Sequence, residues 1–313
     1  MPMAEPVIQA RKISVSFGAV RALTDVDISV ERGTVHGLLG HNGAGKTTLV
    51  NVLSTLIRPT SGTATVAGFD VGDQGHLVRG RIGVTGQFAS VDDNLSGRDN
   101  LVLVARLLGA SSRQARARAD DLLTVFGLTD AARRAVRTYS GGMRRRIDLA
   151  ASLVGRPEVL FLDEPTTGLD PPGRLGLWQI IEDLIATGTT ALLTTQYLTE
   201  ADRLAQEISV LSKGTVTATG TPAALKARVG GASTHLRLAV RADTDRATTL
   251  LTRVGFTPVV GGENPVVILP ATAPTDLATA IRELERGHIA IAEITMAAPT
   301  LDDVYLAVTG THR

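Results

Sequence analysis

The feature that most constrains this chain is a glycine-rich stretch near its start. Residues 40–48 read GHNGAGKTT, which fits the phosphate-loop pattern G-x-x-x-x-G-K-[ST]. The apolar run over residues 34–39 predicts a buried strand before this stretch, and residues 48–53 have the pattern of a helix that follows it. A glycine-rich turn that binds nothing is the alternative. The strand before the loop and the helix after it favour a phosphate site.

The residue types in this loop suit an anion. Glycines let the backbone curl so that successive N–H groups point at one group, and the start of the next helix adds partial positive charge. Lys46 can reach the β- and γ-phosphates of a nucleotide, and the Thr47 hydroxyl can bind Mg²⁺. The predicted binding residues of the loop are Gly40, His41, Asn42, Gly43, Ala44, Gly45, Lys46, Thr47 and Thr48.

Composition sets wider bounds on the chain. Its 313 residues suggest one large or two modest domains, and 43% of them are hydrophobic, which is ample for packed cores. The net charge of +1 gives no argument for a nucleic-acid partner, and the absence of cysteine excludes disulfides. The first residues lack the apolar segment of a signal peptide, and no apolar run approaches the ~20 residues that span a bilayer. We therefore expect the chain to be soluble when it is expressed alone.

Two segments before the phosphate loop alternate apolar and polar residues. Residues 7–17 and 26–30 are predicted to form an antiparallel strand pair. Phe17 ends the first of them. Its ring could stack on a nucleotide base, a contact worth roughly 1–3 kcal/mol, or could fill the core as an ordinary strand aromatic. The pattern leaves both roles open.

The middle of the chain changes to helical periodicity. Residues 95–157 predict a helical insertion that is rich in arginine. A surface for polyanions is one interpretation of these arginines, and solvated helix faces are the favoured one. Ser140, Gly141 and Gly142 at a helix start offer a hydroxyl and two unhindered N–H groups, which predicts a second anion site. Taken alone, these three residues would favour an ordinary helix cap followed by a turn.

A buried strand over residues 159–163 ends in two carboxylates. Asp163 lies where an α/β sheet presents its ligands and could hold Mg²⁺, directly or through water. Glu164 faces the other way and could accept a proton from an attacking water molecule. A strand that merely ends in acidic residues is the alternative, which the preceding phosphate loop disfavours. Another predicted buried strand, residues 190–196, ends in Gln196.

The order of these motifs resembles that of the ATP-binding cassette (ABC) subunits of ABC transporters over about residues 7–228. The resemblance implies that residues 40–47 are the Walker A loop and that residues 139–143 (YSGGM) are a variant signature motif. It makes Gln87 the Q-loop glutamine, a ligand of nucleotide and Mg²⁺. It also makes Glu164 the catalytic glutamate and Asp170 part of the D-loop.

One position departs from the wider family. The resemblance makes Gln196 the switch residue, a position that is usually histidine. The alternative is that Gln196 only caps a strand and has no role in hydrolysis. The strings VTGQFASVD (84–92), LLTTQYL (192–198) and PTLDDVYL (299–306) resemble the daunorubicin/doxorubicin resistance ATP-binding subunits, which also carry glutamine at the switch.

The resemblance implies an α/β P-loop NTPase cassette. It should have a mixed sheet core, an antiparallel β subdomain and a helical subdomain at about residues 88–157, within a domain of residues 1–228. Strands and helices alternate over the remaining residues 229–313, which predicts a small α+β domain, ferredoxin-like in its order. Its last helix could dock on the cassette or a twin copy, or could simply pack in place.

The implied activity is hydrolysis of ATP with Mg²⁺ across a head-to-tail homodimer. Glu164 would polarise water, while Lys46, Mg²⁺ and Gln196 would stabilise the transferring charge. The partner would be a separate membrane permease that exports an antibiotic, drug or natural product, with the chain on the cytoplasmic face of the membrane. No nucleic-acid partner is expected. The alternatives are a soluble ABC-type ATPase that acts on the ribosome or nucleic acid, a regulator without turnover and an importer subunit.

Overall fold

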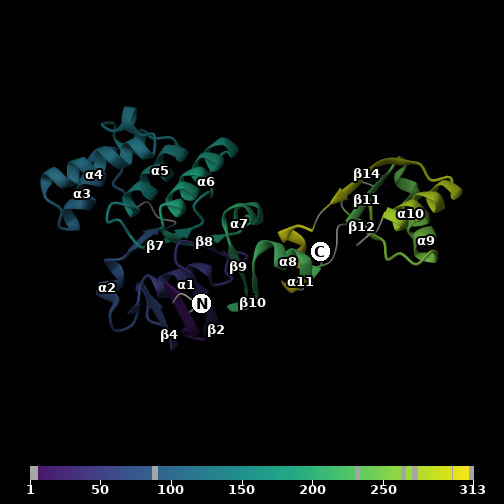
Figure 1. Ribbon diagram of the computed structural model, residues 1–313, viewed down its shortest axis with the longest axis horizontal. Coiled ribbons are helices and arrows are strands. Elements are labelled where there is room, and N and C mark those ends of the chain that lie inside the picture. The colour runs from purple at the N-terminus through teal and green to yellow at the C-terminus, as the bar shows by residue number, and fades with distance from the viewer. Residues whose placement is uncertain are drawn as a thin grey trace. The chain divides into compact units, whose positions relative to one another are not determined.

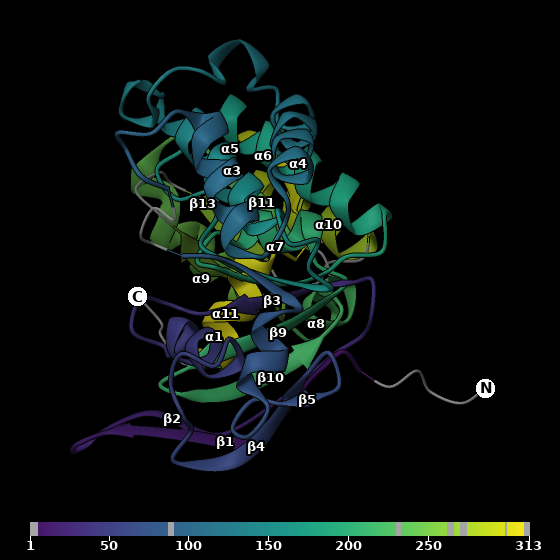
Figure 2. The ribbon, with the colours of Figure 1, turned by 90° about the vertical axis from the view of Figure 1, so that its left-hand side faces the viewer.

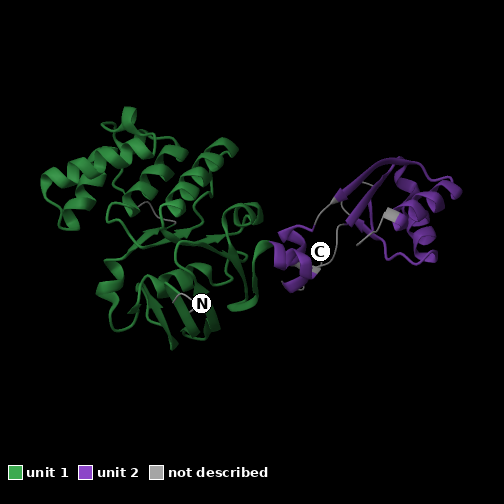
Figure 3. Ribbon diagram, in the orientation of Figure 1, with its two compact units in different colours: residues 1–222 green, residues 223–313 purple. Residues whose placement is uncertain are grey.

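The computed structural model describes residues 6–86, 91–229, 233–261, 266–269, 274–297 and 299–309. The chain divides into two compact units, residues 1–222 and 223–313 (Figure 3). The predicted domain boundary near residue 228 lies a few residues further on, inside α8 (Pro222–Val229). The division of function between the two domains stays a prediction.

A six-stranded sheet forms the centre of unit 1. Its strand order is β10-β9-β3-β8-β7-β6, and its neighbours are parallel except for the β9–β10 hairpin. Every residue of β3, β7 and β8 is buried, as expected for strands covered on both faces. The strands are β3 (Val35–Leu39), β6 (Ile82–Thr85), β7 (Val159–Asp163), β8 (Thr190–Thr195), β9 (Glu207–Ser212) and β10 (Thr215–Gly220).

A second, antiparallel sheet has the order β2-β1-β4-β5. It contains β1 (Ile8–Phe17), β2 (Val20–Val30), β4 (Ser61–Val66) and β5 (Phe69–Asp70). Helix α1 (Lys46–Leu53) contributes buried residues to a core that also contains side chains from both sheets. The predicted antiparallel pair is therefore confirmed, with a second strand that begins earlier than residue 26.

Helices cover the central sheet of unit 1. Figure 1 shows α5 and α6 on one side of the sheet and α1 on the other, and Figure 2 shows α3 to α6 at the opposite end of the unit from β1, β2 and β4. The helices are α2 (Gly75–Arg79), α3 (Gly97–Leu107), α4 (Ser112–Val125), α5 (Gly141–Ser152), α6 (Pro171–Ala186) and α7 (Leu198–Leu204). Short 3₁₀ turns cover Thr129–Ala131, Val136–Thr138 and, in unit 2, Arg241–Asp243.

The predicted helical insertion is confirmed, and its helices begin where serine side chains cap them. Ser96 accepts from the backbone N–H of Asp99, and Ser111 forms a reciprocal capping box with Gln114. Each cap satisfies backbone donors that the first turn of a helix leaves without partners.

Unit 2 has a core of its own. The order of its elements is β11 (Ser233–Leu238), α9 (Thr244–Arg253), β12 (Val259–Gly261), β13 (Val266–Leu269), α10 (Pro274–Arg286), β14 (Ile291–Ala297) and α11 (Leu301–Thr309). The strands form an antiparallel sheet in the order β12-β13-β11-β14, and side chains of α9 and α10 pack with it in one buried cluster. This β-α-β-β-α-β arrangement is the ferredoxin-like order that the sequence analysis names, although the short strand β12 was not itself predicted.

Candidate functional site

The phosphate loop connects β3 to α1, and two of its glycines are required by their surroundings. Gly45 precedes α1 with a left-handed φ of 109°, and a Cβ there would lie 2.7 Å from the carbonyl oxygen of Ala22. A Cβ on Gly40 would lie 2.5 Å from the carbonyl oxygen of Leu211. At these two positions the loop backbone lies directly against β9 and β2, so any residue larger than glycine would clash there.

Lys46 is buried across this loop, with 5% of its side chain exposed. Its Nζ donates to the carbonyl oxygens of Gly40 at 2.7 Å and His41 at 3.1 Å. The same nitrogen lies 3.4 Å from Oε1 of Glu164. Two residues that are far apart in the sequence, and that the sequence predicts to act together, thus meet at one point.

A cleft of about 480 Å³ opens over the loop. Most of the predicted loop residues line it, whereas Gly40 and Ala44 are buried behind it. Val20, Arg21 and Ala22 at the start of β2 also line the cleft, and the sequence alone gave no signal for them. The predicted residues in the lining are His41, Asn42, Gly43, Gly45, Lys46, Thr47, Thr48 and Glu164.

Asp163 ends β7 beside the phosphate loop. Its Oδ2 accepts from the Thr47 hydroxyl at 2.9 Å, and its Oδ1 accepts from the Thr194 hydroxyl at 2.5 Å. A hydroxyl and a carboxylate that converge in this way are the oxygen ligands that Mg²⁺ prefers. The described residues contain no cluster of three or more acidic or histidine side chains for a metal, so these two could hold Mg²⁺ only together with phosphate oxygens and water.

Glu164 follows Asp163 in a left-handed backbone conformation, with a φ of 47°. Its N–H donates to both the carbonyl oxygen and the hydroxyl of Thr194, at 3.0 and 3.1 Å. The side chain is 11% exposed, and its Oε2 accepts from the Thr167 hydroxyl at 3.3 Å. The backbone around this carboxylate is thus fixed, while its tip reaches the phosphate-loop cleft.

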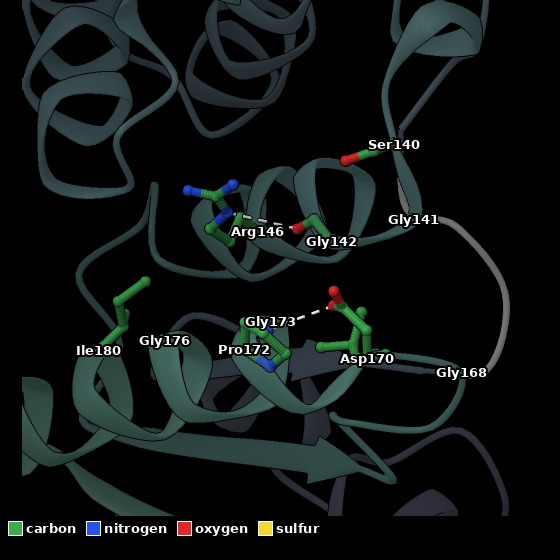
Figure 4. A pocket seen from close by; sticks show the side chains of 11 residues that line it. Ser140, Gly141, Gly142, Arg146, Gly168, Asp170, Pro172, Gly173, Gly176 and Ile180 are labelled. Atoms are coloured by element: carbon green, nitrogen blue, oxygen red, sulfur yellow. Dashed lines mark hydrogen bonds between the residues drawn. The ribbon is translucent and has the colours of Figure 1, made fainter.

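The Ser-Gly-Gly segment lies at a different place. Ser140 caps α5 by accepting from the N–H of Met143 at 3.3 Å. Asp170 caps α6 by accepting from the N–H of Gly173 at 3.2 Å. Both caps line a cavity of about 600 Å³, and Figure 4 shows the Asp170 carboxylate pointing from α6 toward the first turn of α5. Gly141 and Gly142 line it as well.

Within the described part of the chain, this signature cavity and the phosphate-loop cleft share no lining residue. The segment predicted to form a second anion site therefore lies at a separate half-site of the same unit, and its binding of an anion stays a prediction. Each half-site lies at the start of a helix, α1 or α5, and each is a cavity open on one side.

The remaining predicted residues to place are Phe17, Gln196 and Gln87. Phe17 is 54% exposed, so the interpretation as a core aromatic is wrong, and it pairs with Val20 at the cleft. Gln196 follows β8 and is exposed, and the described lining of the phosphate-loop cleft does not include it. Gln87 lies outside the described residues. The proposed contacts of all three with nucleotide stay predictions.

Comparison with known proteins agrees with this geometry. The family model described as ABC transporter matches residues 23–167. The daunorubicin resistance ATP-binding protein DrrA3 of Streptomyces coeruleorubidus is 49% identical over 312 residues, which cover 99% of this chain and 98% of that protein. The daunorubicin/doxorubicin resistance ATP-binding protein DrrA of Streptomyces peucetius is 46% identical and covers 94% and 89%, respectively.

Solved structures agree on the fold. An ATP-binding subunit of an ABC transporter superposes with a TM-score of 0.64 at 26% identity, over 71% of this chain and 92% of that one. The structure of cbiO1 from Clostridium perfringens has a TM-score of 0.66 at 23% identity, over 80% and 98%. The fold and the phosphate-loop site are thus those of an ABC-type ATPase. The chain belongs to the ABC transporter ATP-binding proteins, in the family of daunorubicin/doxorubicin resistance ATP-binding proteins.

None of the helices in the described ranges combines the length and the apolar composition that crossing a membrane requires.

Proposed function

We propose that this chain is the ATP-hydrolysing subunit of a multicomponent exporter and works as a head-to-tail homodimer on a separate membrane permease. The observation that carries the proposal is the separation of the two half-sites on unit 1. A triphosphate in the phosphate-loop cleft would be covered on one side only. The signature cavity of a second copy would bring the N–H groups and positive end of α5 to its other side.

The residues of the cleft support hydrolysis. Glu164 and Lys46 both line the cleft, where Glu164 would accept the proton of an attacking water and Lys46 would neutralise charge on the transferring phosphoryl group. Thr47 and Asp163 would hold Mg²⁺, which neutralises phosphate charge when it is bound. Gln196 would add a neutral hydrogen bond, and Gln87 would report the state of the nucleotide to the permease.

The names of the relatives support a drug or antibiotic as the exported cargo. Relatives at 45–49% identity are named for daunorubicin or doxorubicin resistance. A relative at 31% identity over 97% of this chain is the linearmycin resistance ATP-binding protein LnrL of Bacillus subtilis. We infer that this chain powers the export of a drug, antibiotic or natural product from the cytoplasmic face of the membrane.

Co-expression tests the proposal. The chain should sediment with membranes when it is produced with a six-span membrane protein from its own gene neighbourhood, and it should raise the resistance of a sensitive host to anthracyclines or a related natural product. The Glu164→Gln protein should sediment equally well and confer no resistance, because it lacks the base. Absence of any shift to membranes would instead favour an ABC-type ATPase that acts on the ribosome or nucleic acid.

A further inference from the structure

Arg145 of α5 forms a cluster of hydrogen bonds that the site described above does not use. Its Nε donates to the carbonyl oxygen of Pro165 at 2.6 Å, and its Nη1 donates to that of Gly86 at 3.0 Å. Its Nη2 donates to the carbonyl oxygens of Asp163 at 3.0 Å and Glu164 at 2.8 Å. All four acceptors are backbone atoms, so one side chain of the signature helix holds the ends of two strands.

The backbone that Arg145 holds is strained at one residue. Glu164 has a φ of 47°, a conformation that residues other than glycine adopt infrequently. Such a residue persists only where its surroundings over-determine it. Here Thr194 fixes the N–H of Glu164, and Arg145 fixes its carbonyl oxygen. The peptide groups on both sides of the carboxylate are therefore anchored.

The electrostatic surroundings of Arg145 favour a fixed cation. Burial lowers the pKa of its guanidinium, and the carboxylates of Asp148, Asp163, Glu200 and Glu164 oppose that shift. Because an arginine side chain stays protonated in proteins, the guanidinium keeps its donors throughout the physiological pH range. Its planar fork of five N–H groups can serve four carbonyls at once, which the three donors of a lysine ammonium cannot do in the same geometry.

We propose that Arg145 is a positioning residue that holds the Glu164 carboxylate at the phosphate-loop cleft by anchoring the backbone on which it is carried. Because Arg145 belongs to the helix that starts with the signature, it also ties the signature half-site to the catalytic loop of the same chain. If α5 moved when its signature end bound the nucleotide of a partner copy, Arg145 would transmit that movement to Glu164. This inference rests on the proposed role of Glu164 as the base.

Steady-state hydrolysis by the full chain tests the inference. Arg145→Lys keeps the charge and loses the fork, so kcat should fall about 10- to 100-fold, as expected when a catalytic group is misplaced by about 1 Å. The KM for MgATP should change less than about threefold, because Arg145 is not among the residues that line the described phosphate-loop cleft. Arg144→Lys is the matched control: Arg144 lies one residue earlier and pairs with Asp93 at 3.2 Å near the surface, so its kcat should equal that of the wild type.

A double-mutant cycle separates positioning from a general loss of structure. In Glu164→Gln the carboxylate that Arg145 positions is gone. Adding Arg145→Lys should therefore lower the residual single-turnover rate by less than about twofold. An equal fall in both backgrounds would mean that Arg145 acts independently of Glu164 and would overturn the inference.

The remaining outcomes are also decisive. A kcat of Arg145→Lys equal to that of the wild type would overturn the inference and leave the proposed function intact, whereas absence of turnover in the wild type would contradict the proposed function itself. If neither Arg145→Lys nor Arg145→Gln gives a cooperative thermal transition, Arg145 is needed for folding and the positioning role is overturned.

Discussion

Glu200 on α7 is a fully buried carboxylate outside the phosphate-loop cleft. Its Oε1 accepts from the indole N–H of Trp178 at 3.0 Å, and its Oε2 has no hydrogen-bond partner among the described residues. Burial raises the pKa of Glu200, while the hydroxyls of Thr195 and Thr166, the indole and the charge of Arg174 oppose the rise. This carboxylate therefore makes stability depend on pH.

The sign of that dependence follows from proton linkage. Below the ordinary pKa of 4.5, Glu200 holds its proton in both the folded and the unfolded chain. As the pH rises above this value, the unfolded chain releases its proton first, so the free energy of unfolding falls until the pH passes the raised pKa of the folded state.

Replacement of Glu200 by glutamine should remove this dependence. Glu200→Gln keeps an oxygen for Trp178 and cannot ionise, so the Tm of the mutant relative to the wild type should increase between pH 4.5 and pH 7. Calorimetry across this range measures it. Glu182→Gln is a control: Arg203 lowers the pKa of Glu182, so the contribution of this pair to stability is lost only as the pH falls below 4.5, and the Tm difference of this mutant should change little between pH 4.5 and pH 7. A Tm difference for Glu200→Gln that does not vary with pH would contradict the prediction.

Gln196 carries a second prediction at the residue scale. Histidine at this position would titrate near its unperturbed pKa of ~6.5, whereas glutamine cannot. The pH–rate profile of the wild type should therefore lack a limb from this position, and Gln196→His should add one near neutral pH. Gln196→Ala should lower turnover, because it loses the neutral donor to the γ-phosphate.

Steady-state ATPase assays across pH measure these effects. Thr199→Ala, an exposed neighbour on α7, serves as the matched control and should match the wild type. If Gln196→Ala also matches the wild type at every pH, Gln196 makes no contact with the phosphate during turnover.

At the scale of elements, sequence reasoning succeeded where the signal is local. The strand–loop–helix around the phosphate loop, and the strand and helix order of unit 2 apart from the short β12, are each encoded by a periodicity and by turn residues. Ser140 as a helix cap was found for the same reason, since a cap is chosen by residues next to it in sequence.

Sequence reasoning failed where contacts depend on register or packing. Thr194 donates to Asp163 because β7 and β8 pair in parallel with these two residues opposite each other. The sequence of one strand does not reveal which residues of the neighbouring strand lie opposite it, so this contact could not be predicted. The four bonds of Arg145 depend in the same way on how α5 packs against the strand ends. Helix α6 is a different case, because its start does carry local signals in the sequence: Asp170 as its cap and Pro171 in its first turn.

At the scale of the whole molecule, the candidate site is distributed over two places of unit 1. The phosphate-loop cleft contains Lys46 and Glu164. The signature cavity contains two helix caps, and Arg146 is the one basic residue in its described lining. Arg146 itself donates to the carbonyl oxygens of Gly142 and Phe126. In the proposed homodimer, a second copy would cover the face of the nucleotide that the phosphate-loop cleft leaves open.

The proposed dimer gives the last prediction. Glu164→Gln keeps the shape of the carboxylate and loses the base, which typically contributes about 10²–10⁴-fold, so the mutant should trap MgATP and double its mass in light scattering after size exclusion. Adding Lys46→Ala should abolish both ATP binding and the dimer, because Lys46 supplies the buried charge of the cleft.

Adding Gly141→Asp instead separates binding from dimer formation. A Cβ on Gly141 would meet no atom within 4 Å, so the substitution should fold, yet it places a negative charge where the partner's phosphates are expected. This double mutant should bind ATP by calorimetry and remain a monomer, since its phosphate-loop cleft is intact and its signature cavity repels the triphosphate of a second copy. A stable ATP-bound dimer of the Gly141→Asp protein would mean that the signature cavity does not face the nucleotide of a partner, and the head-to-tail arrangement would then be wrong.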